Sequence, residues 1–240
     1  MASAGERILD TTVRVPWRSY TRSVRLLVAT TNRGKLREIR DLLADLPIEL
    51  ATLDEVPRSE APEETGRTFA ENAQLKARHY ASATGLLTVA EDSGLEIDAL
   101  GGAPGVGSAR FGGVNSSYAD KFALIYQRLR RPGAAAAHPG GAITAAAATS
   151  RPTARFVCAL AVAEGASILF ESRGTVEGEI APKPQGDGGF GYDPIFYYPP
   201  LGCTLAEAGR GKGEVSHRGN AFRHLRSWLI SQVLRSSPPP

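Results

Sequence analysis

The sequence predicts an α/β fold, and three observations support this prediction. Short aliphatic runs typical of buried strands alternate with amphipathic segments typical of helices. Polar residues and glycines gather where several predicted strands end, and open α/β sheets bind ligands at strand ends. The 240 residues, 42% of them hydrophobic and 22% charged, suit one sizeable domain or two small lobes that share a core.

In the N-terminal half, the predicted elements follow one another closely. Residues 24–30 have the aliphatic character of a buried strand, and residues 34–46 place leucine and isoleucine on one helical face. A second strand is expected at 48–53. The segment Thr68–Glu71 matches a capping box, which predicts a helix from there to about Thr84. Residues 86–94 then predict a strand that runs into a polar turn at "EDSG".

The C-terminal half continues the alternation. We expect a helix over about 118–129, a strand at 155–163, and a strand, a bend and another strand within 167–180. A loop dense in glycine and proline follows from 181 to 200. Apolar side chains at helical spacing predict a last helix over about 220–234.

Three segments fall outside this alternation. Residues 1–23 are expected to be a disordered extension, and residues 236–240 a disordered tail. The Ala/Gly/Pro-rich tract 131–153 is expected to be a flexible insertion, because the patterns on either side need each other to complete a sheet. Residues 24–235 are therefore predicted to form a single domain.

Composition excludes several classes of function. No apolar run approaches the ~20 residues that cross a bilayer, so no membrane span is expected. A net charge of +3 without a long basic run does not indicate nucleic-acid binding. The two cysteines form no CxxC pair and no metal-binding spacing, which favours a reducing, cytoplasmic setting.

Carboxylates are the first candidates for chemistry. Glu91 and Asp92 directly follow an apolar strand, where a carboxylate can hold Mg²⁺ or accept a proton from water. The alternative is that Asp92 and Ser93 only cap a turn. Glu63 and Glu64 offer further carboxylates, although glutamates in a proline-containing loop are often solvated surface residues.

Cationic and helix-start residues are candidates for anion binding. Three lysines could pair with phosphate, against the alternative of simple surface positions: Lys35, Lys76 and Lys212. Asn32 and Gly34 can cap a helix whose backbone N–H groups hold an anion. Lys76 lies four residues after Asn72, so both project from one helical face.

Aromatic and imidazole side chains suggest a base site. The segment "GGFGYDP" combines a flexible backbone with Phe190 and Tyr192, which could stack on a base or fill a core. Ser216, His217 and Arg218 offer hydrogen-bond donors ahead of the last helix, or an N-cap with exposed neighbours.

The order of these motifs carries more information than any single one. The series "TTNRGKLREI", "EETGRTFAENAQLKA", "AEDSGLEIDALGGAPGVGSARF", "GTVEGEI", "GDGGFGYDPIF" and "SHRGNAF" resembles the inosine triphosphate pyrophosphatase family from about Arg25 to Leu234. The resemblance implies an elongated, long twisted mixed sheet with flanking helices, two lobes around a central substrate cleft, and a homodimer. It also implies Mg²⁺-dependent hydrolysis of ITP, dITP and XTP to the monophosphate and pyrophosphate, which clears deaminated purines from the nucleotide pool.

The resemblance also implies roles for individual residues. Asp92 matches the general base and a metal ligand, and Glu63 and Glu91 match metal-binding carboxylates. Glu91 stands where many bacterial members have a second aspartate. The implied substrate contacts are Thr30, Thr31, Asn32, Arg33, Gly34, Lys35, Asn72, Lys76, Ser93, Phe190, Gly191, Tyr192, Asp193, Lys212, His217 and Arg218. Donors at His217 and Arg218 would favour a 6-keto purine over adenine.

Two alternatives remain open from the sequence. Maf-like pyrophosphatases share this kind of architecture and act on pyrimidine or modified nucleotides, but "SHRGN" and "GGFGYDP" resemble the purine-directed family. A non-catalytic nucleotide-binding or RNA-binding module is the second alternative. The acidic residues Glu63, Glu91 and Asp92 argue against it, because without a metal they would repel phosphate.

Overall fold

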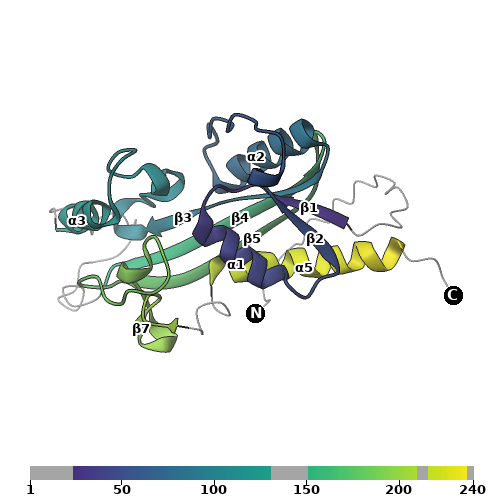
Figure 1. Ribbon diagram of the computed structural model, residues 1–240. Helices are drawn as coiled ribbons and strands as arrows, with labels where there is room; N and C mark the ends of the chain where they lie inside the picture. The colour runs from purple at the N-terminus through teal and green to yellow at the C-terminus, as the bar shows by residue number, and fades with distance from the viewer. Residues whose placement is uncertain (1–23, 131–150, 210–215, 237–240) are drawn as a thin grey trace, which may run out of the picture.

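A single mixed sheet organises the chain. The computed structural model describes residues 24–130, 151–209 and 216–236 (Figure 1). Its seven strands are β1 (Val24–Val28), β2 (Ile48–Thr52), β3 (Leu87–Ile97), β4 (Thr153–Glu164), β5 (Ser167–Ile180), β6 (Phe196–Tyr198) and β7 (Cys203–Thr204). They lie in the order β2-β1-β3-β4-β5-β6-β7. β1 is parallel to β2 and β3, and every pair from β3 to β7 is antiparallel.

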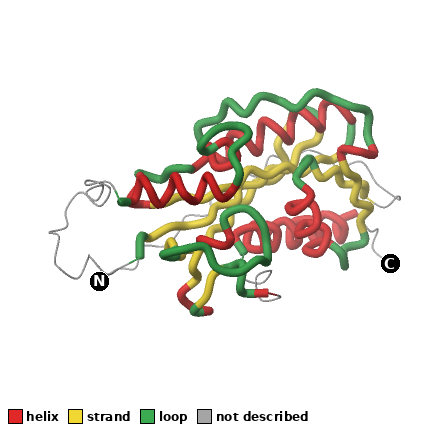
Figure 2. Tube along the Cα trace, turned by 60° about the vertical axis from the view of Figure 1, so that its left-hand side comes forward, coloured by secondary structure: helices red, strands yellow, loops and turns green. Residues whose placement is uncertain are grey.

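Helices cover both faces of the sheet. The helices that matter for the site are α1 (Arg33–Leu43), α2 (Phe69–Thr84), α3 (Tyr118–Leu129), α5 (His217–Ser236) and the 3₁₀ helix η3 (Gly105–Arg110). α1 and α5 pack on one face and α2 on the other, and Figure 2 shows the strands as a layer between helices. No helix within the described ranges combines the length and the apolar character of a membrane span.

Local sequence explains where these helices begin. Thr68 and Glu71 form the predicted capping box at α2, and Ser117 and Asp120 form another at α3. The side chain of Asn32 caps α1. Each cap supplies acceptors to backbone N–H groups that have no partner within the helix. The last helix begins at His217, three residues before the predicted start, and α1 covers 33–43 rather than 34–46.

Separate cores divide the domain into two lobes. Around α1, α5 and α2, both faces of the sheet are closed by aliphatic and alanine clusters that include Leu26 and Ala77. A second core around α3 contains Leu95, Phe122 and Phe196. The long strands β3, β4 and β5 run through both lobes, as Figure 1 shows. The predicted α/β fold with a long mixed sheet and two lobes is confirmed.

Unequal strand lengths open the sheet at its centre. β3 pairs with β1 only as far as Val89, whereas its pairing with β4 continues to Ile97. The segment Glu91–Ile97 therefore has no β1 neighbour. The predicted turn at "EDSG" was wrong, because pairing with β4 along this whole segment outweighs the turn preference of Asp, Ser and Gly.

The predicted bend within 167–180 was also wrong. β5 is one strand that pairs along β4, with a single shift of register between Val162 and Ala163. Gly174 serves packing instead of a bend: a Cβ there would overlap the carbonyl oxygen of His217. The missing side chain lets the start of α5 lie directly on the sheet.

The predicted extension 1–23, most of the predicted insertion 131–153 and most of the predicted tail 236–240 lie outside the described residues. Both predicted bounds were wrong by one residue where the structure describes them, because Thr153 begins β4 and Ser236 ends α5. Lys212 lies outside the described residues as well.

Candidate active site

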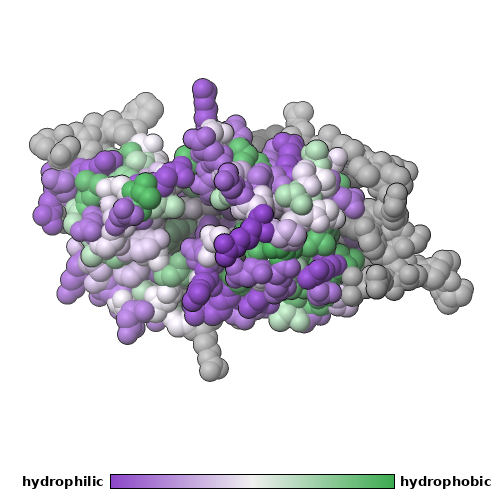
Figure 3. Space-filling view, turned by 45° about the horizontal axis from the view of Figure 1, so that its top comes forward, coloured by the Kyte–Doolittle hydropathy of each residue, from purple (hydrophilic) through white to green (hydrophobic). Residues whose placement is uncertain are grey.

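A cavity of about 580 Å³ lies between the two lobes. Figure 3 shows a hollow in the surface between the part built around α3 and the part built around α1 and α2. Most of the predicted site residues line this cavity: Thr30, Thr31, Asn32, Lys35, Glu63, Lys76, Glu91, Asp92, Ser93, Phe190, Gly191, Tyr192, Asp193, His217 and Arg218. Both lobes contribute, so segments far apart in the sequence meet here.

Asp92 lies on the α2 side of β3 and is almost buried. Asn72 Nδ2 donates to its Oδ2 over 3.1 Å, and Lys76 Nζ lies 3.2 Å from its Oδ1. The spacing of four residues between Asn72 and Lys76 brings both onto this carboxylate, as the helical face predicted. Burial raises the pKa of Asp92 above its ordinary value, although the Lys76 ammonium opposes that shift.

Glu64 is the loop carboxylate that reaches this cluster. Its Oε1 accepts from Lys76 Nζ over 2.8 Å, and its Oε2 accepts from Arg110 Nη1 over 2.9 Å. Burial would raise the pKa of Glu64, but Lys76 and Arg110 hold it below its ordinary value. Glu63 lines the same cavity with an exposed side chain. The structure therefore places the second carboxylate beside Asp92 one residue later than predicted.

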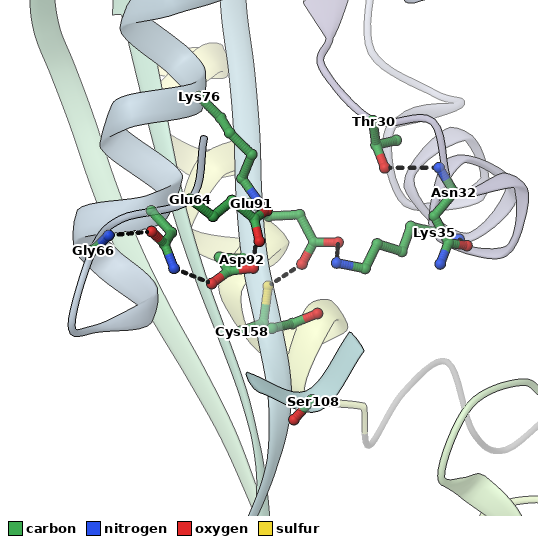
Figure 4. A network of polar contacts seen from close by, with 12 residues as sticks. Thr30, Asn32, Lys35, Glu64, Gly66, Lys76, Glu91, Asp92, Ser108 and Cys158 are labelled. Atoms are coloured by element: carbon green, nitrogen blue, oxygen red, sulfur yellow. Dashed lines mark hydrogen bonds and ion pairs between the residues drawn. The ribbon is translucent and has the colours of Figure 1, made fainter. Parts of the chain in front are cut away.

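The donor set fits a divalent cation that also binds substrate oxygen. Within the described ranges no cluster of three or more His, Cys, Asp or Glu side chains forms a metal site by itself. Glu64 and Asp92 nevertheless converge on one cation, the Lys76 ammonium, as Figure 4 shows. Mg²⁺ is commonly held by one or two carboxylates together with water and substrate phosphates. Two carboxylates beside an open cavity match that arrangement.

Glu91 points to the opposite face of β3, because successive strand residues alternate. Its carboxylate pairs with Lys35 at 3.2 Å and with Arg218 at 3.0 Å, and it accepts from Cys158 Sγ over 3.0 Å. Burial would raise the pKa of Glu91, but Arg218 and Lys35 hold it well below its ordinary range. Burial raises the pKa of the Cys158 thiol, which keeps the proton that it donates.

Arg218 is the most deeply placed cation of the site, with 1% of its surface exposed. Besides Glu91, its guanidinium binds Glu38 and donates to Ser93 Oγ over 3.1 Å. These acceptors fix the plane of the guanidinium at the cavity wall, with the ring of Phe190 5.6 Å away. The structure thus gives Glu91 and Ser93 a common role, because both hold Arg218.

The start of α1 forms another wall of the cavity. Asn32 Oδ1 accepts from the backbone N–H of Gly34 over 2.9 Å and of Lys35 over 3.1 Å. Thr30 Oγ1 accepts from the N–H of Asn32, which fixes the turn out of β1. A Cβ on Gly34 would lie 3.0 Å from the ring of Phe190. The glycine therefore lets Phe190, which comes from the "FGYD" segment, pack over this helix start.

The "FGYD" segment has mixed roles. Asp193 Oδ2 accepts from the N–H of Phe190 over 2.7 Å, which closes the turn. Tyr192 is 4% exposed and its hydroxyl donates to the carbonyl of Ser108 over 2.8 Å, so it joins this segment to η3. His217 stacks on Phe156, with ring centroids 4.8 Å apart. Phe190 is consequently the aromatic of this segment best placed to face a base.

Comparison with known proteins shows which family has this sequence. A model of the Ham1 family matches residues 26–228. The chain belongs to the Ham1 family. A relative from Exiguobacterium sp., named dITP/XTP pyrophosphatase, is 44% identical over 208 residues, which cover 86% of this chain and 97% of the relative. A relative of the same name from Thermus thermophilus is 42% identical, over 91% and 96% of the two chains.

Solved structures agree with this assignment to the Ham1 family. A HAM1 protein from Coxiella burnetii superposes with a TM-score of 0.73 at 40% identity, over 87% of this chain and 99% of that one. A Ham1 protein from Staphylococcus aureus gives a TM-score of 0.72 at 35% identity, with the same coverage. The family resemblance read from the motifs is confirmed.

Two residues that line the cavity were not predicted from the sequence. Arg110 and Tyr118 line the cavity although neither was predicted to do so. The only sequence signal for Arg110 was its place in the "GVGSARF" part of a family motif. Conversely, three predicted substrate contacts are not among the residues that line the cavity: Arg33, Gly34 and Asn72. Arg33 and Gly34 lie at the start of α1, and Asn72 positions Asp92 through a hydrogen bond. Glu64 could not be told from Glu63, since a loop has no periodicity that assigns a facing side.

Proposed function

We propose that this protein hydrolyses the deaminated purine nucleotides dITP, ITP and XTP to their monophosphates and pyrophosphate. The relatives named dITP/XTP pyrophosphatase support this substrate class. The observation that carries the proposal is the cavity between the lobes, where Asp92, Glu64 and two lysines surround a space open to a nucleotide. Hydrolysis of such nucleotides would remove deaminated purines from the nucleotide pool.

Asp92 is the general base in this proposal. Its carboxylate takes a proton from the attacking water, which then adds to the α-phosphorus and displaces pyrophosphate. The hydrogen bond from Asn72 orients the carboxylate, and the raised pKa makes it a stronger base than an exposed aspartate.

Lys35 and Lys76 stabilise the charge that develops on the phosphates. Each rests on a carboxylate in the structure, at 3.2 Å from Glu91 and 2.8 Å from Glu64 respectively. Mg²⁺ bound by Asp92 and Glu64 would neutralise the triphosphate and lower the pKa of the attacking water. Glu91 is left out of this ligand pair, because its carboxylate already compensates Lys35 and Arg218 on the other face.

Base recognition falls on Phe190, His217 and Arg218. Phe190 offers an aromatic face, and His217 and Arg218 line the same cavity with groups that can donate hydrogen bonds. A 6-keto purine offers an acceptor to such donors, whereas adenine offers an amino group and would leave donors facing donors. A site built to donate hydrogen bonds can thereby discriminate by orders of magnitude.

Cys158 and Cys203 are both free in the structure, which suits a reducing cytoplasm. We further propose a homodimer whose only small-molecule partners are the nucleotide and Mg²⁺, without nucleic acid or membrane.

A nucleotide panel tests the proposal. Pyrophosphate release is measured with dITP, ITP, XTP, ATP, GTP, dTTP and UTP, with Mg²⁺ and with EDTA. We expect release from dITP, ITP and XTP at least about 100-fold faster than from ATP, and none in EDTA. Preference for dTTP or UTP would instead favour the Maf-like alternative. Nucleotide binding without any pyrophosphate release would favour a non-catalytic module.

A further inference from the structure

Arg110 is a cation that lines the cavity and has no role in the proposed reaction. It ends η3 in the lobe of α3, lines the cavity, and has a side chain that is 48% exposed. Its Nη1 donates to Glu64 Oε2 over 2.9 Å. Glu64 belongs to the segment that leads into α2, so this ion pair joins the two lobes across the cavity. Arg110 therefore shares Glu64 with Lys76, a phosphate-binding candidate.

We propose that Arg110 is a further substrate-binding residue, which binds the pyrophosphate part of the nucleoside triphosphate. This inference rests on the proposed function and adds one contact to it. The competing explanation is that Arg110 only positions Glu64 and never meets substrate.

The order of charges places Arg110 on the leaving-group side. Asp92, Lys76, Glu64 and Arg110 form a chain of alternating sign, in which each contact is between 2.8 and 3.2 Å. Asp92 lies beside the reacting α-phosphorus in the proposed reaction. Arg110 stands at the far end of this chain, with Lys76 and Glu64 between it and Asp92, which suits the β- and γ-phosphates.

The backbone beside Arg110 is held rigidly. Ser108 Oγ accepts from the N–H of Leu95 over 3.0 Å and donates to the carbonyl of Gly105 over 2.6 Å. Gly94 makes this approach possible, because a Cβ there would overlap Ser108 Oγ. Lys121 Nζ donates to the carbonyl of Ala109 over 2.6 Å. Arg110 is thus anchored to β3, the strand that carries Asp92, and a site fixed in this way binds without a large ordering cost.

The chemistry of the guanidinium suits this role. Its planar fork of N–H donors matches two oxygens of a phosphate and remains charged at every relevant pH. In the structure the carboxylate of Glu64 forms ion pairs with two cations, Lys76 and Arg110, and its own negative charge repels phosphate. Removal of the Glu64 charge should therefore release both cations toward an anion.

The test uses inorganic pyrophosphate in EDTA and measures its Kd by calorimetry on the full chain. We expect Glu64→Gln to bind pyrophosphate at least as tightly as the wild type does. We expect the double variant Glu64→Gln/Arg110→Gln to bind about tenfold more weakly than Glu64→Gln alone. In the Glu64→Gln background Arg110 has no carboxylate charge at position 64 to hold, so a positioning role through Glu64 cannot produce this second difference.

Three controls sharpen the comparison. Arg128→Gln removes the same charge from the same lobe, at a side chain that packs over Phe111, and should leave the Kd within about twofold. IMP lacks the pyrophosphate part, so Arg110→Gln should leave its Kd unchanged. Arg110→Lys keeps the charge without the fork, and should give an intermediate Kd that guards against a folding defect in the glutamine variant.

Equal Kd values for Glu64→Gln and the double variant would overturn the inference, as would no measurable pyrophosphate binding to Glu64→Gln. A matching loss of IMP binding in Arg110→Gln would also overturn it, because the contact would then be to the α-phosphate. Pyrophosphate release from dITP by the wild type is measured in parallel. An active wild type with no Arg110 effect refutes only this inference, whereas an inactive wild type refutes the proposed function.

Discussion

Replacement of Glu91 by glutamine should strongly destabilise the fold. Glu91 and Arg218 have side chains that are 2% and 1% exposed, and their charges lie 3.0 Å apart. Lys35 adds a second contact at 3.2 Å from a side chain that is 18% exposed. The amide keeps the shape and removes the negative charge, so Arg218 keeps only Glu38 as a carboxylate partner among those described.

The expected magnitude follows from this burial. Removal of one partner of a buried ion pair costs about 3–5 kcal/mol of unfolding free energy, because a buried charge loses its compensation. For a chain of this size each kcal/mol lowers Tm by about 2–4 °C, so Tm should fall by about 6–20 °C. The matched control is Glu49→Gln, whose partner Arg25 is exposed, and which should cost less than about 1 kcal/mol.

Denaturant unfolding at several pH values provides the assay. The folded-state pKa of Glu91 is held well below its ordinary value of 4.5 by Arg218 and Lys35, which outweigh burial. A lowered pKa stabilises the fold above the unfolded-state pKa, and this stabilisation is lost as the pH falls toward the folded-state pKa. The difference between wild type and Glu91→Gln should stay constant from about pH 6 to about pH 8 and shrink below about pH 4.5. If Glu91→Gln costs no more than Glu49→Gln, the buried network does not hold Arg218 as we argue.

Three further variants test the transition-state contact of Lys76, the packing of η3 on β3, and base recognition by His217. Lys76→Met should lower kcat for dITP about 100-fold, because it removes a donor to the charged transition state; steady-state kinetics that show an unchanged kcat would exclude that role. Gly94→Ala should cost about 1–3 kcal/mol in denaturant unfolding, because its methyl group would overlap Ser108 Oγ and lie 2.8 Å from the carbonyl of Gly105; wild-type stability would mean that η3 yields easily. His217→Ala should lower the ratio of kcat/KM for ITP over ATP by about tenfold, and an unchanged ratio would remove His217 from base recognition.

The sequence predicted those parts of the site that local periodicity controls. The capping box at Thr68 fixed the phase of α2, so Asn72 and Lys76 could be placed on one face before the structure placed Asp92 there. Asn32 was likewise predicted as a cap, since a short polar side chain after a strand has few other uses.

Pairing between strands that are distant in the sequence determined the parts of the site that the sequence did not predict. "EDSG" has the composition of a turn, yet pairing with β4 extends it and sends Glu91 and Asp92 to opposite faces. Only this alternation shows that one carboxylate compensates Arg218 and the other meets Lys76. The choice between Glu63 and Glu64, and the contact of Arg110 with Glu64, depend on how two lobes meet across a cavity.

Pyrophosphate release from dITP by Asp92→Asn tests whether Asp92 is the general base. The amide keeps the size of the side chain and loses the base, so the rate should fall about 10²- to 10⁴-fold while Tm stays close to that of the wild type. Asp187→Asn, in the loop before "FGYD", serves as a control on an exposed aspartate and should keep the wild-type rate. Release by Asp92→Asn at the wild-type rate would show that Asp92 is not the general base.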